Sequence, residues 1–405
     1  MEKFSMKPRT ATQLGIMHGF PPPPEKRPDL TNWDLPPYNR WSFLNMRSLF
    51  PTVEVKADCN NPQVLPTSPK DLSSIVFRDH SGEEKSIAEF LDSSYTDGFL
   101  VLHKGQIITE DYFNSMKPDT LHLAQSVSKS LVGSLTGILH SQGIIDLDCL
   151  IADYIPELKN CGYGGVKLSN ALNMTSGIRF VEDYNLPGSD MTRIDIAAGW
   201  RPVPTGTVRP TIRDVILTLP KVDVHGRIFK YKSVETDVVA WVLERASNKS
   251  LAELVSDLIW KKIGAEHGAF FTVDESSTAL ADGGFNASLR DFGRFGLMMQ
   301  NSGSVGEIEV VPKSWVDTCA TGNQNIFGPP YSDNSADGAY SNFWWVNNIE
   351  RGDYMARGVF GQMIYINRSA ELTIIKLSSW PDYISNDYTR DSFFAFSAIQ
   401  DFLTR

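Results

Sequence analysis

The sequence predicts an α/β chain of the α+β type, in which a sheet is flanked by helices. Apolar runs with strand character lie near both ends of the chain, at residues 99–113 and 362–377. Helical periodicity dominates the stretch between these two runs. Because strands occur toward both ends and helices in the middle, we expect a mixed sheet built from both ends, with a helical region inserted between them.

The first part of the chain predicts an arm, a hairpin and a helix in that order. Residues 1–40 are rich in proline and lack periodicity, which is typical of an extended arm on the surface. Two apolar runs, 99–103 and 107–113, surround a short turn that contains Gly105 and predict a β-hairpin. A helix is then expected from about residue 126 to 142.

The later elements follow from the same patterns. Expected helices span 234–246, 251–263, 289–299 and 391–403, and expected paired strands span 362–366 and 372–377. These patterns predict an extended arm over 1–60, a sheet domain from 61–125 with 276–405, and a mostly helical region over 126–275. The active-site cleft is expected between the sheet domain and the helical region.

Composition excludes several classes of function. The chain has 405 residues, a formal net charge of −10 and no run rich in lysine or arginine. Nucleic-acid binding and attachment to an acidic membrane therefore have no electrostatic support. No stretch approaches 18 apolar residues and no secretory signal is recognised, so we expect a cytoplasmic location.

Metal and disulfide chemistry also lack support in the sequence. The four cysteines, Cys59, Cys149, Cys161 and Cys319, are far apart and are expected as free thiols. The seven histidines show no metal-ligand spacing, and no dinucleotide or phosphate-binding glycine pattern occurs. We expect no cofactor and no metal, and a small molecule as the partner; the oligomeric state is left open, a homodimer included.

The stretch Ser126-Val127-Ser128-Lys129 carries the main chemical signal. Residues three apart share a helix face, so the Ser126 hydroxyl and the Lys129 amine can meet. Serine becomes a nucleophile when a base removes its proton, and a poorly hydrated lysine with a lowered pKa can be that base. The apolar neighbours of Lys129 favour such a lowered pKa. The alternative is an ordinary helix start with a solvated lysine.

Two further segments complete a catalytic hypothesis. Tyr231 lies between a strand-like run, 227–230, and a predicted helix, and its hydroxyl can relay protons; the alternative is a packing tyrosine. Residues 358–362 begin a strand with glycines, where a backbone N–H can complete an oxyanion hole. A bulge or turn is the alternative for that segment.

Taken together, these segments resemble the Ser-x-x-Lys arrangement of class C β-lactamases, penicillin-binding proteins and family VIII carboxylesterases. The resemblance extends most clearly to the 6-aminohexanoate-dimer hydrolases, which cleave nylon oligomers. It covers nearly the whole chain from Trp33. The segments that carry it are Trp33, 36–41, 95–102, 126–130, 154–158, 182–184, 198–201, 236–237, 240–241 and 376–382.

This resemblance implies a β-lactamase/transpeptidase-like fold, with an antiparallel sheet, and a role for each matching residue. Ser126 matches the nucleophile, Lys129 its base and Tyr231 the tyrosine that works with them. The backbone N–H groups of Ser126 and Val359 match the oxyanion hole.

The resemblance also implies substrate contacts. Tyr184 matches a loop tyrosine near the scissile nitrogen, Asp195 an acid that holds an ammonium group, and Trp200 a cleft tryptophan. Asp282 falls where relatives carry a polar residue that tunes amide hydrolysis. Each has a structural alternative. Tyr184 can be a surface-loop aromatic, Asp195 a helix cap or a surface charge, and Trp200 a core residue. Asp282 can be a turn residue before two glycines.

Two positions depart from the pattern of the relatives. Ala356-Arg357-Gly358 stands where lactamases and transpeptidases have Lys-Thr-Gly, which weakens β-lactam recognition, although Arg357 partly replaces the charge. Phe360 stands where the nearest relatives have histidine and leaves the acyl pocket less polar.

We therefore expect a serine hydrolase that forms an acyl-enzyme with small esters or linear amides. The alternatives are a plain carboxylesterase, a non-catalytic ligand sensor on the same fold, and a β-lactamase.

Overall fold

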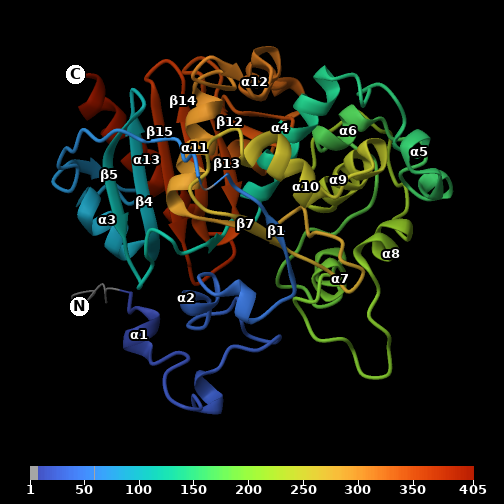
Figure 1. The fold of residues 1–405 in the computed structure, drawn as a ribbon, viewed down its shortest axis with the longest axis horizontal. Helices are drawn as coiled ribbons and strands as arrows, with labels where there is room; N and C mark the ends of the chain where they lie inside the picture. Colours follow the sequence, from blue (N-terminus) through green and yellow to red (C-terminus); the bar gives the residue numbers. More distant parts are fainter. Residues whose placement is uncertain (1–7, 59) are drawn as a thin grey trace.

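The computed structural model describes residues 8–58 and 60–405, and a seven-stranded antiparallel sheet forms its centre (Figure 1). The order of the strands in this sheet is β11 (Ala339–Ser341), β12 (Trp344–Asn348), β13 (Asp353–Gly358), β14 (Gln362–Asn367), β15 (Leu372–Ser378), β4 (Thr96–His103) and β5 (Gln106–Tyr112). The prediction that strands from both ends share one sheet is confirmed, because β15 pairs with β4. The sheet is antiparallel throughout, as the family resemblance implied, and not mixed.

A second sheet connects the N-terminal arm to the rest of the chain. Its order is β1 (Thr52–Val55), β7 (Ala269–Thr272), β8 (Phe285–Ala287) and β6 (His122–Leu123). Two short hairpins pair β2 (Val76–Arg78) with β3 (Glu84–Ser86) and β9 (Ser304–Val305) with β10 (Ile308–Glu309). The second sheet matters for the site because β6 leads directly into the segment that carries Ser126.

The helices fall into two groups. Those of the arm and of the layers around the large sheet are α1 (Ala11–Leu14), α2 (Asn39–Ser42), α3 (Ile87–Ser93), α4 (Val127–Ser141), α11 (Leu289–Gln300), α12 (Lys313–Cys319) and α13 (Asn386–Thr404). Those of the helical region are α5 (Ile151–Tyr154), α6 (Leu168–Leu172), α7 (Asp190–Ala197), α8 (Ile212–Leu217), α9 (Val234–Ser247) and α10 (Leu251–Val255). Figure 1 shows this second group gathered to one side of the large sheet.

Helix α4 is buried along almost its whole length, which explains its apolar sequence. Its residues from Val127 to Leu139 are buried, and it packs between the sheet strand β13 and helix α9. The expected end at about residue 142 is confirmed, since Gly143 adopts φ +69° just after the helix. Helix α4 therefore joins the sheet to the helical region.

The N-terminal arm is not confined to the surface, contrary to expectation. Trp33 is 1% exposed, and its ring packs edge-on against Trp200 with 4.9 Å between centroids. The Trp33 Nε1–H also donates a 2.9 Å hydrogen bond to the Trp200 carbonyl. A tryptophan buries a large apolar area, so this residue fixes the arm to the helical region.

Two local expectations are wrong. The strand-like run at 227–230 has no regular structure, because Phe229 there packs against loop and strand aromatics instead of pairing as a strand. The helix predicted over 251–263 is α-helical only to Val255 and continues as a π-helical segment, Ser256–Trp260. Hydrophobic periodicity does not distinguish these helix types over so short a distance.

The remaining features of the fold concern the cysteines and the apolar character of the helices. Cys149, Cys161 and Cys319 are free thiols, and Cys59 lies outside the described residues. In the described part of the chain, none of the helices combines the length and the apolar character needed to cross a bilayer.

Candidate active site

Ser126 occupies the N-cap position of α4, at the end of a strained turn. It is 9% exposed, and Gln125 immediately before it adopts φ +49°. A non-glycine residue in the left-handed region is uncommon and is often found at functional sites. The turn directs the chain from β6 into α4 and leaves the Ser126 hydroxyl at the edge of a cavity.

Lys129 lies one helical turn later and meets Ser126 as the spacing predicts. The Lys129 side chain is buried, and its Nζ donates hydrogen bonds of 2.9 Å to Ser126 Oγ and 2.6 Å to the Asp282 carbonyl. The Nζ also lies 5.4 Å from the centroid of the Tyr231 ring. The structure therefore brings together Ser126, Lys129 and Tyr231, which are separated by up to about a hundred residues in the sequence.

The pKa of Lys129 differs from expectation. Burial alone lowers it, but electrostatic interaction with Tyr231 and with the carboxyl groups of Asp282 and Glu182 outweighs burial, and the net shift is upward. The pKa of Tyr231 is also raised, because burial and Glu182 outweigh the opposing effect of Lys129 and of hydrogen bonds with Ser126 and Lys129. At neutral pH the resting pair therefore holds a lysine ammonium and a tyrosine hydroxyl. The apolar sequence around Lys129 gave no sign of these acidic neighbours.

The end of β13 passes very close to Ser126. A Cβ atom on Gly358 would lie 2.7 Å from the Ala124 carbonyl oxygen and 3.0 Å from the Ser126 nitrogen, so only glycine fits without movement of the backbone. Val359 follows at once and lines the same cavity as Ser126. This approach brings the backbone of Val359 close to Ser126, as an oxyanion hole formed by the two backbone N–H groups would require.

Phe360 does not lie where a substrate-binding residue was expected. It is 1% exposed, adopts φ +60°, and packs its ring against Phe43 at 5.1 Å and Tyr383 at 4.6 Å. It lines neither of the two cavities that open at Ser126. Its left-handed backbone turns the chain just after Val359, so its role here is to hold that turn.

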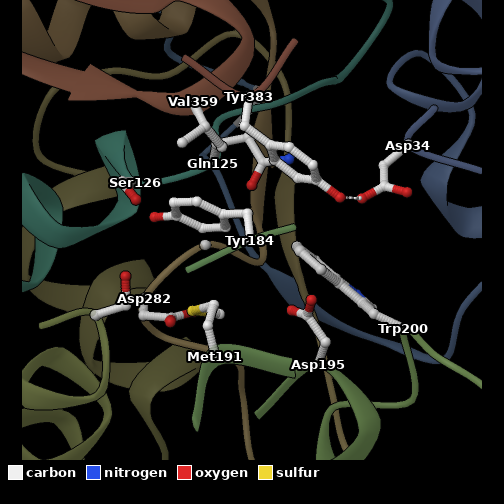
Figure 2. Close-up of a pocket in the computed structure, with 12 residues that line it drawn as sticks. Asp34, Gln125, Ser126, Tyr184, Met191, Asp195, Trp200, Asp282, Val359 and Tyr383 are labelled. Atoms are coloured by element: carbon white, nitrogen blue, oxygen red, sulfur yellow. Dashed lines mark hydrogen bonds between the residues drawn. The ribbon is translucent and has the colours of Figure 1, made fainter. Parts of the chain in front are cut away.

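An inner cavity with acidic walls opens on one side of Ser126 (Figure 2). Its volume is about 30 Å³, enough for a small group such as an ammonium. The residues that line it are Asp34, Gln125, Ser126, Tyr184, Met191, Asp195, Trp200, Ser233, Asp282, Gly283, Val359 and Tyr383. Four expected substrate contacts, Tyr184, Asp195, Trp200 and Asp282, thus meet in one cavity.

The carboxyl groups of the inner cavity repel one another. Burial raises the pKa of Asp195 to about 8, with Asp34 and Asp282 adding to the shift and Arg201 opposing it. Burial likewise raises the pKa of Asp282 to about 6, although Lys129 opposes that shift. Such a cavity favours a cationic group, because a positive charge would stabilise both carboxylates.

A buried aspartate behind the cavity positions the Asp282 backbone. The Asp237 carboxyl accepts hydrogen bonds from the N–H groups of Ala281, at 2.9 Å, and Asp282, at 3.2 Å. Burial, together with the charge of Asp282, raises the pKa of Asp237 well above its usual value. The loop that it holds presents the carbonyl to which Lys129 donates.

Tyr184 lies between Ser126 and the rest of the inner cavity. Figure 2 shows its hydroxyl directed toward Ser126. The ring stacks on Tyr383 at 5.1 Å, and the hydroxyl donates a 2.7 Å hydrogen bond to Glu182. Sequence reasoning missed three residues of this site: Glu182, Tyr383 and Asp34. The Asp34 carboxylate binds Arg201 and accepts a 2.8 Å hydrogen bond from Tyr383. Glu182 lies inside one of the segments that carry the family resemblance, and Asp34 and Tyr383 each directly follow one.

A larger outer cavity opens on the other side of Ser126. Its volume is about 510 Å³, and its walls combine aromatic side chains with acidic and basic ones. Ser126, Tyr184, Val359 and Tyr383 line both cavities, whereas Tyr231 and Arg357 line only the outer one. Ser126 therefore lies at the junction of the two cavities.

One cluster outside the site has metal-ligand residue types. In the described part of the chain, Asp79, His80 and Asp391 bring potential ligand atoms close together. The Lys85 ammonium already lies 3.0 Å from an Asp79 oxygen and 3.1 Å from an Asp391 oxygen. Because a cation already balances these carboxylates, we assign no metal site to them.

Sequence comparison relates the chain to one protein family. The family model described as Beta-lactamase matches residues 85–392. The chain belongs to the Beta-lactamase family. A 6-aminohexanoate-dimer hydrolase from Paenarthrobacter ureafaciens is 33% identical to it over 358 residues, which cover 88% of this chain and 89% of the relative. This chain is accordingly a serine hydrolase with the β-lactamase/transpeptidase-like fold.

Solved structures support the same assignment of the fold. A Bacillus anthracis protein provisionally described as a 6-aminohexanoate-dimer hydrolase superposes with a TM-score of 0.86 at 28% identity, covering 93% of this chain and 97% of that one. A family VIII carboxylesterase superposes with a TM-score of 0.55 at 14% identity, covering 74% and 92%, and shows likeness of fold alone.

Proposed function

We propose that this serine hydrolase cleaves linear amides and esters of small carboxylic acids through an acyl-enzyme on Ser126. The observation that carries the proposal is the 2.9 Å contact between Lys129 Nζ and Ser126 Oγ at the junction of two cavities. The acidic inner cavity favours an acyl group that ends in an ammonium. The name of the Paenarthrobacter ureafaciens relative supports 6-aminohexanoate oligomers as the substrate class.

In the acylation step, Ser126 Oγ bonds to the substrate carbonyl carbon and its proton passes to the pair formed by Lys129 and Tyr231. The pair must first lose a proton, because both groups are protonated at rest. The N–H groups of Ser126 and Val359 hold the oxyanion, and each such donor commonly contributes about 3 kcal/mol. The bond from carbon to the leaving nitrogen or oxygen then breaks, and the pair returns the proton to the leaving group.

Deacylation repeats these steps with water. The Lys129–Tyr231 pair takes a proton from water as its oxygen bonds to the acyl carbon, and Ser126 regains a proton when the ester bond breaks. Tyr231 lies on the outer side of Ser126, so the leaving group departs into the outer cavity and the acyl group stays on the inner side.

Amide cleavage is favoured over ester cleavage alone by two inner residues. A leaving nitrogen must be protonated, and the Tyr184 hydroxyl is directed toward Ser126, where that nitrogen would lie. Asp195 offers a partner for the ammonium of an aminoacyl group. Plain carboxylesterase activity remains the second candidate, because an alkoxide leaves with less help from an acid.

The test is turnover of p-nitrophenyl acetate and butyrate by the wild type and Ser126→Ala, with the 6-aminohexanoate dimer assayed in parallel. We expect both esters and the dimer to be hydrolysed by the wild type only. Ester turnover without dimer cleavage would favour the plain carboxylesterase. Full activity of Ser126→Ala, or no turnover by the wild type, would reject the catalytic assignment and favour a ligand sensor.

A further inference from the structure

Lys232, the residue directly after Tyr231, is a buried cation that the catalytic steps above do not use. Its side chain is 1% exposed, and its Nζ donates hydrogen bonds of 3.0 Å to the Ser176 carbonyl and 3.1 Å to the Lys230 carbonyl. The Glu235 carboxylate lies 3.6 Å from the same Nζ and completes an ion pair. Three oxygen atoms thus face Nζ, which matches the three N–H donors of an ammonium.

Tyr231 itself lies in a segment without regular secondary structure. Residues 228–232 belong to neither a helix nor a strand, and the Tyr231 N–H donates its hydrogen bond to a side chain, the Tyr331 hydroxyl, at 3.0 Å. Just before it, the Lys230 N–H donates a 2.9 Å hydrogen bond to the Met174 carbonyl. Because these residues are outside any backbone ladder, the position of Tyr231 depends on the side chains around it.

Lys232 joins this segment to a neighbouring loop and to helix α9. Ser176 belongs to the loop: its carbonyl accepts the hydrogen bond from Lys232, and its hydroxyl donates one to the Glu235 carboxylate. Glu235 lies in the first turn of α9. The loop, the irregular segment and the helix are therefore connected through one buried group of contacts that begins directly after Tyr231.

The acidic partner of Lys232 is buried as well. Glu235 is 0% exposed, and burial raises its pKa to about 7, although Lys232, Ser176 and Tyr163 oppose the shift. Burial lowers the pKa of Lys232, and Glu235 opposes that shift. A buried ion pair generally gives no more stability than apolar residues of the same volume. The effect to be expected from this pair is therefore a fixed geometry of the segment that carries it.

We propose that Lys232 is a positioning residue that holds the Tyr231 hydroxyl within reach of Lys129 and Ser126. The Tyr231 ring centroid lies 5.4 Å from Lys129 Nζ, and a misplacement of about 1 Å in an active site can reduce the rate about 100-fold. The inference rests on the proposed function, which makes Tyr231 part of the proton relay. Because this relay serves esters and amides alike, loss of Lys232 should slow the cleavage of both.

The experiment is a double-mutant cycle of Lys232→Met and Tyr231→Phe, with p-nitrophenyl butyrate as the substrate. We expect Lys232→Met alone to lower kcat about 10- to 100-fold and to change KM less than about 3-fold. In the Tyr231→Phe background the same substitution should lower kcat less than about 3-fold, because no hydroxyl remains to be positioned. If the two losses multiplied instead, Lys232 would not act through Tyr231, and the inference would be overturned.

A second variant and a control accompany the cycle. Glu235→Gln keeps the size of the side chain and removes the acidic partner, so it should lower kcat in the same direction but less. It replaces Lys232→Met throughout if thermal unfolding shows that Lys232→Met does not fold. The control is Lys230→Met, since the Lys230 side chain is exposed and lines neither cavity at Ser126. Its kcat should match that of the wild type, whereas an unchanged kcat in Glu235→Gln and Lys232→Met would overturn the inference.

Crystal structures of the wild type and of the variant give a readout that needs no turnover. We expect the Tyr231 ring to lie farther from Lys129 Nζ in Lys232→Met than in the wild type. A ring in the same position in both would overturn the inference. The two proposals can thus fail separately: if the wild type hydrolyses neither ester nor amide, the proposed function fails, while the crystal structures still decide whether Lys232 positions Tyr231.

Discussion

The carboxylate of Glu182 accepts hydrogen bonds from Ser233, at 2.7 Å from the backbone N–H and 2.6 Å from the hydroxyl. The same carboxylate accepts the hydrogen bond of the Tyr184 hydroxyl. Ser233 begins α9 two residues after Tyr231, so Glu182 links the loop tyrosine to the segment of the proton-relay tyrosine. Glu182 thus holds the loop that carries Tyr184 against the segment that carries Tyr231.

Glu182→Gln should therefore weaken amide cleavage more than ester cleavage. We expect kcat on the 6-aminohexanoate dimer to fall about 10-fold and ester turnover to change less than about 3-fold, the scale of one charged hydrogen bond. Steady-state kinetics on both substrates measures this. Glu157→Gln, which removes only an exposed ion pair with Arg245, is the control. Equal losses on amide and ester would contradict a role specific to the loop.

Asp195 should make the binding of amines depend on pH. Its pKa of about 8 means that it is mostly protonated at pH 7, and only its ionised form attracts an ammonium. KM for the 6-aminohexanoate dimer should therefore fall as pH rises from 6.5 to about 8.5. Asp195→Asn should abolish this dependence and raise KM about 10- to 100-fold.

The control for Asp195 is a neutral ester such as p-nitrophenyl butyrate, whose KM should not change in the variant. Calorimetry in buffers of different ionisation enthalpy adds a direct readout, because binding of the amine at pH 7 should release a proton from the wild type. An equal effect of Asp195→Asn on dimer and ester would contradict an ammonium site.

Gly358→Ala should damage the oxyanion hole. The added methyl would lie 2.7 Å from the Ala124 carbonyl and force apart the backbones that carry the two N–H donors. We expect kcat to fall about 100- to 1000-fold on amides and esters alike. Gly165→Ala is the control, since its nearest neighbour would be His225 at 3.8 Å. Retention of more than a tenth of wild-type kcat would argue against the role of the Val359 N–H.

The raised pKa of Lys129 should appear in the pH–rate profile. A base must be unprotonated to accept the serine proton, so kcat/KM on a neutral ester should rise about tenfold per pH unit through the neutral range. Tyr231 contributes more than any other group to the raised pKa of Lys129. Tyr231→Phe should therefore shift the rise of kcat/KM with pH to lower pH. It should also reduce kcat about 100-fold or more, as loss of a proton relay does.

Tyr354→Phe is the matched control for Tyr231, because it removes a buried hydroxyl that donates to the Met299 carbonyl and does not line the outer cavity. Its pH profile should follow that of the wild type. If kcat/KM of Tyr231→Phe rose over the same pH range as that of the wild type, electrostatic coupling between the tyrosine and Lys129 would be contradicted.

Local sequence predicted the parts of the site that depend on local geometry. The contact of Ser126 with Lys129 follows from helical spacing, and strand β15 follows from its apolar run. The electrostatics of Lys129 could not be predicted in this way, because Glu182 and Asp282 reach it from distant segments. The position of Phe360 was missed for a similar reason: a left-handed φ at a bulky residue has no signature in composition.

The N-terminal arm forms part of the wall of the inner cavity, since Asp34 lines this cavity and the Trp33 ring packs against Trp200. The family model, however, begins only at residue 85. Substrate choice in such hydrolases can thus diverge through a segment that lies outside the shared domain and carries none of the reacting groups. Exchange of this segment between relatives is a route to new selectivity that leaves the nucleophile, its base and the oxyanion donors untouched.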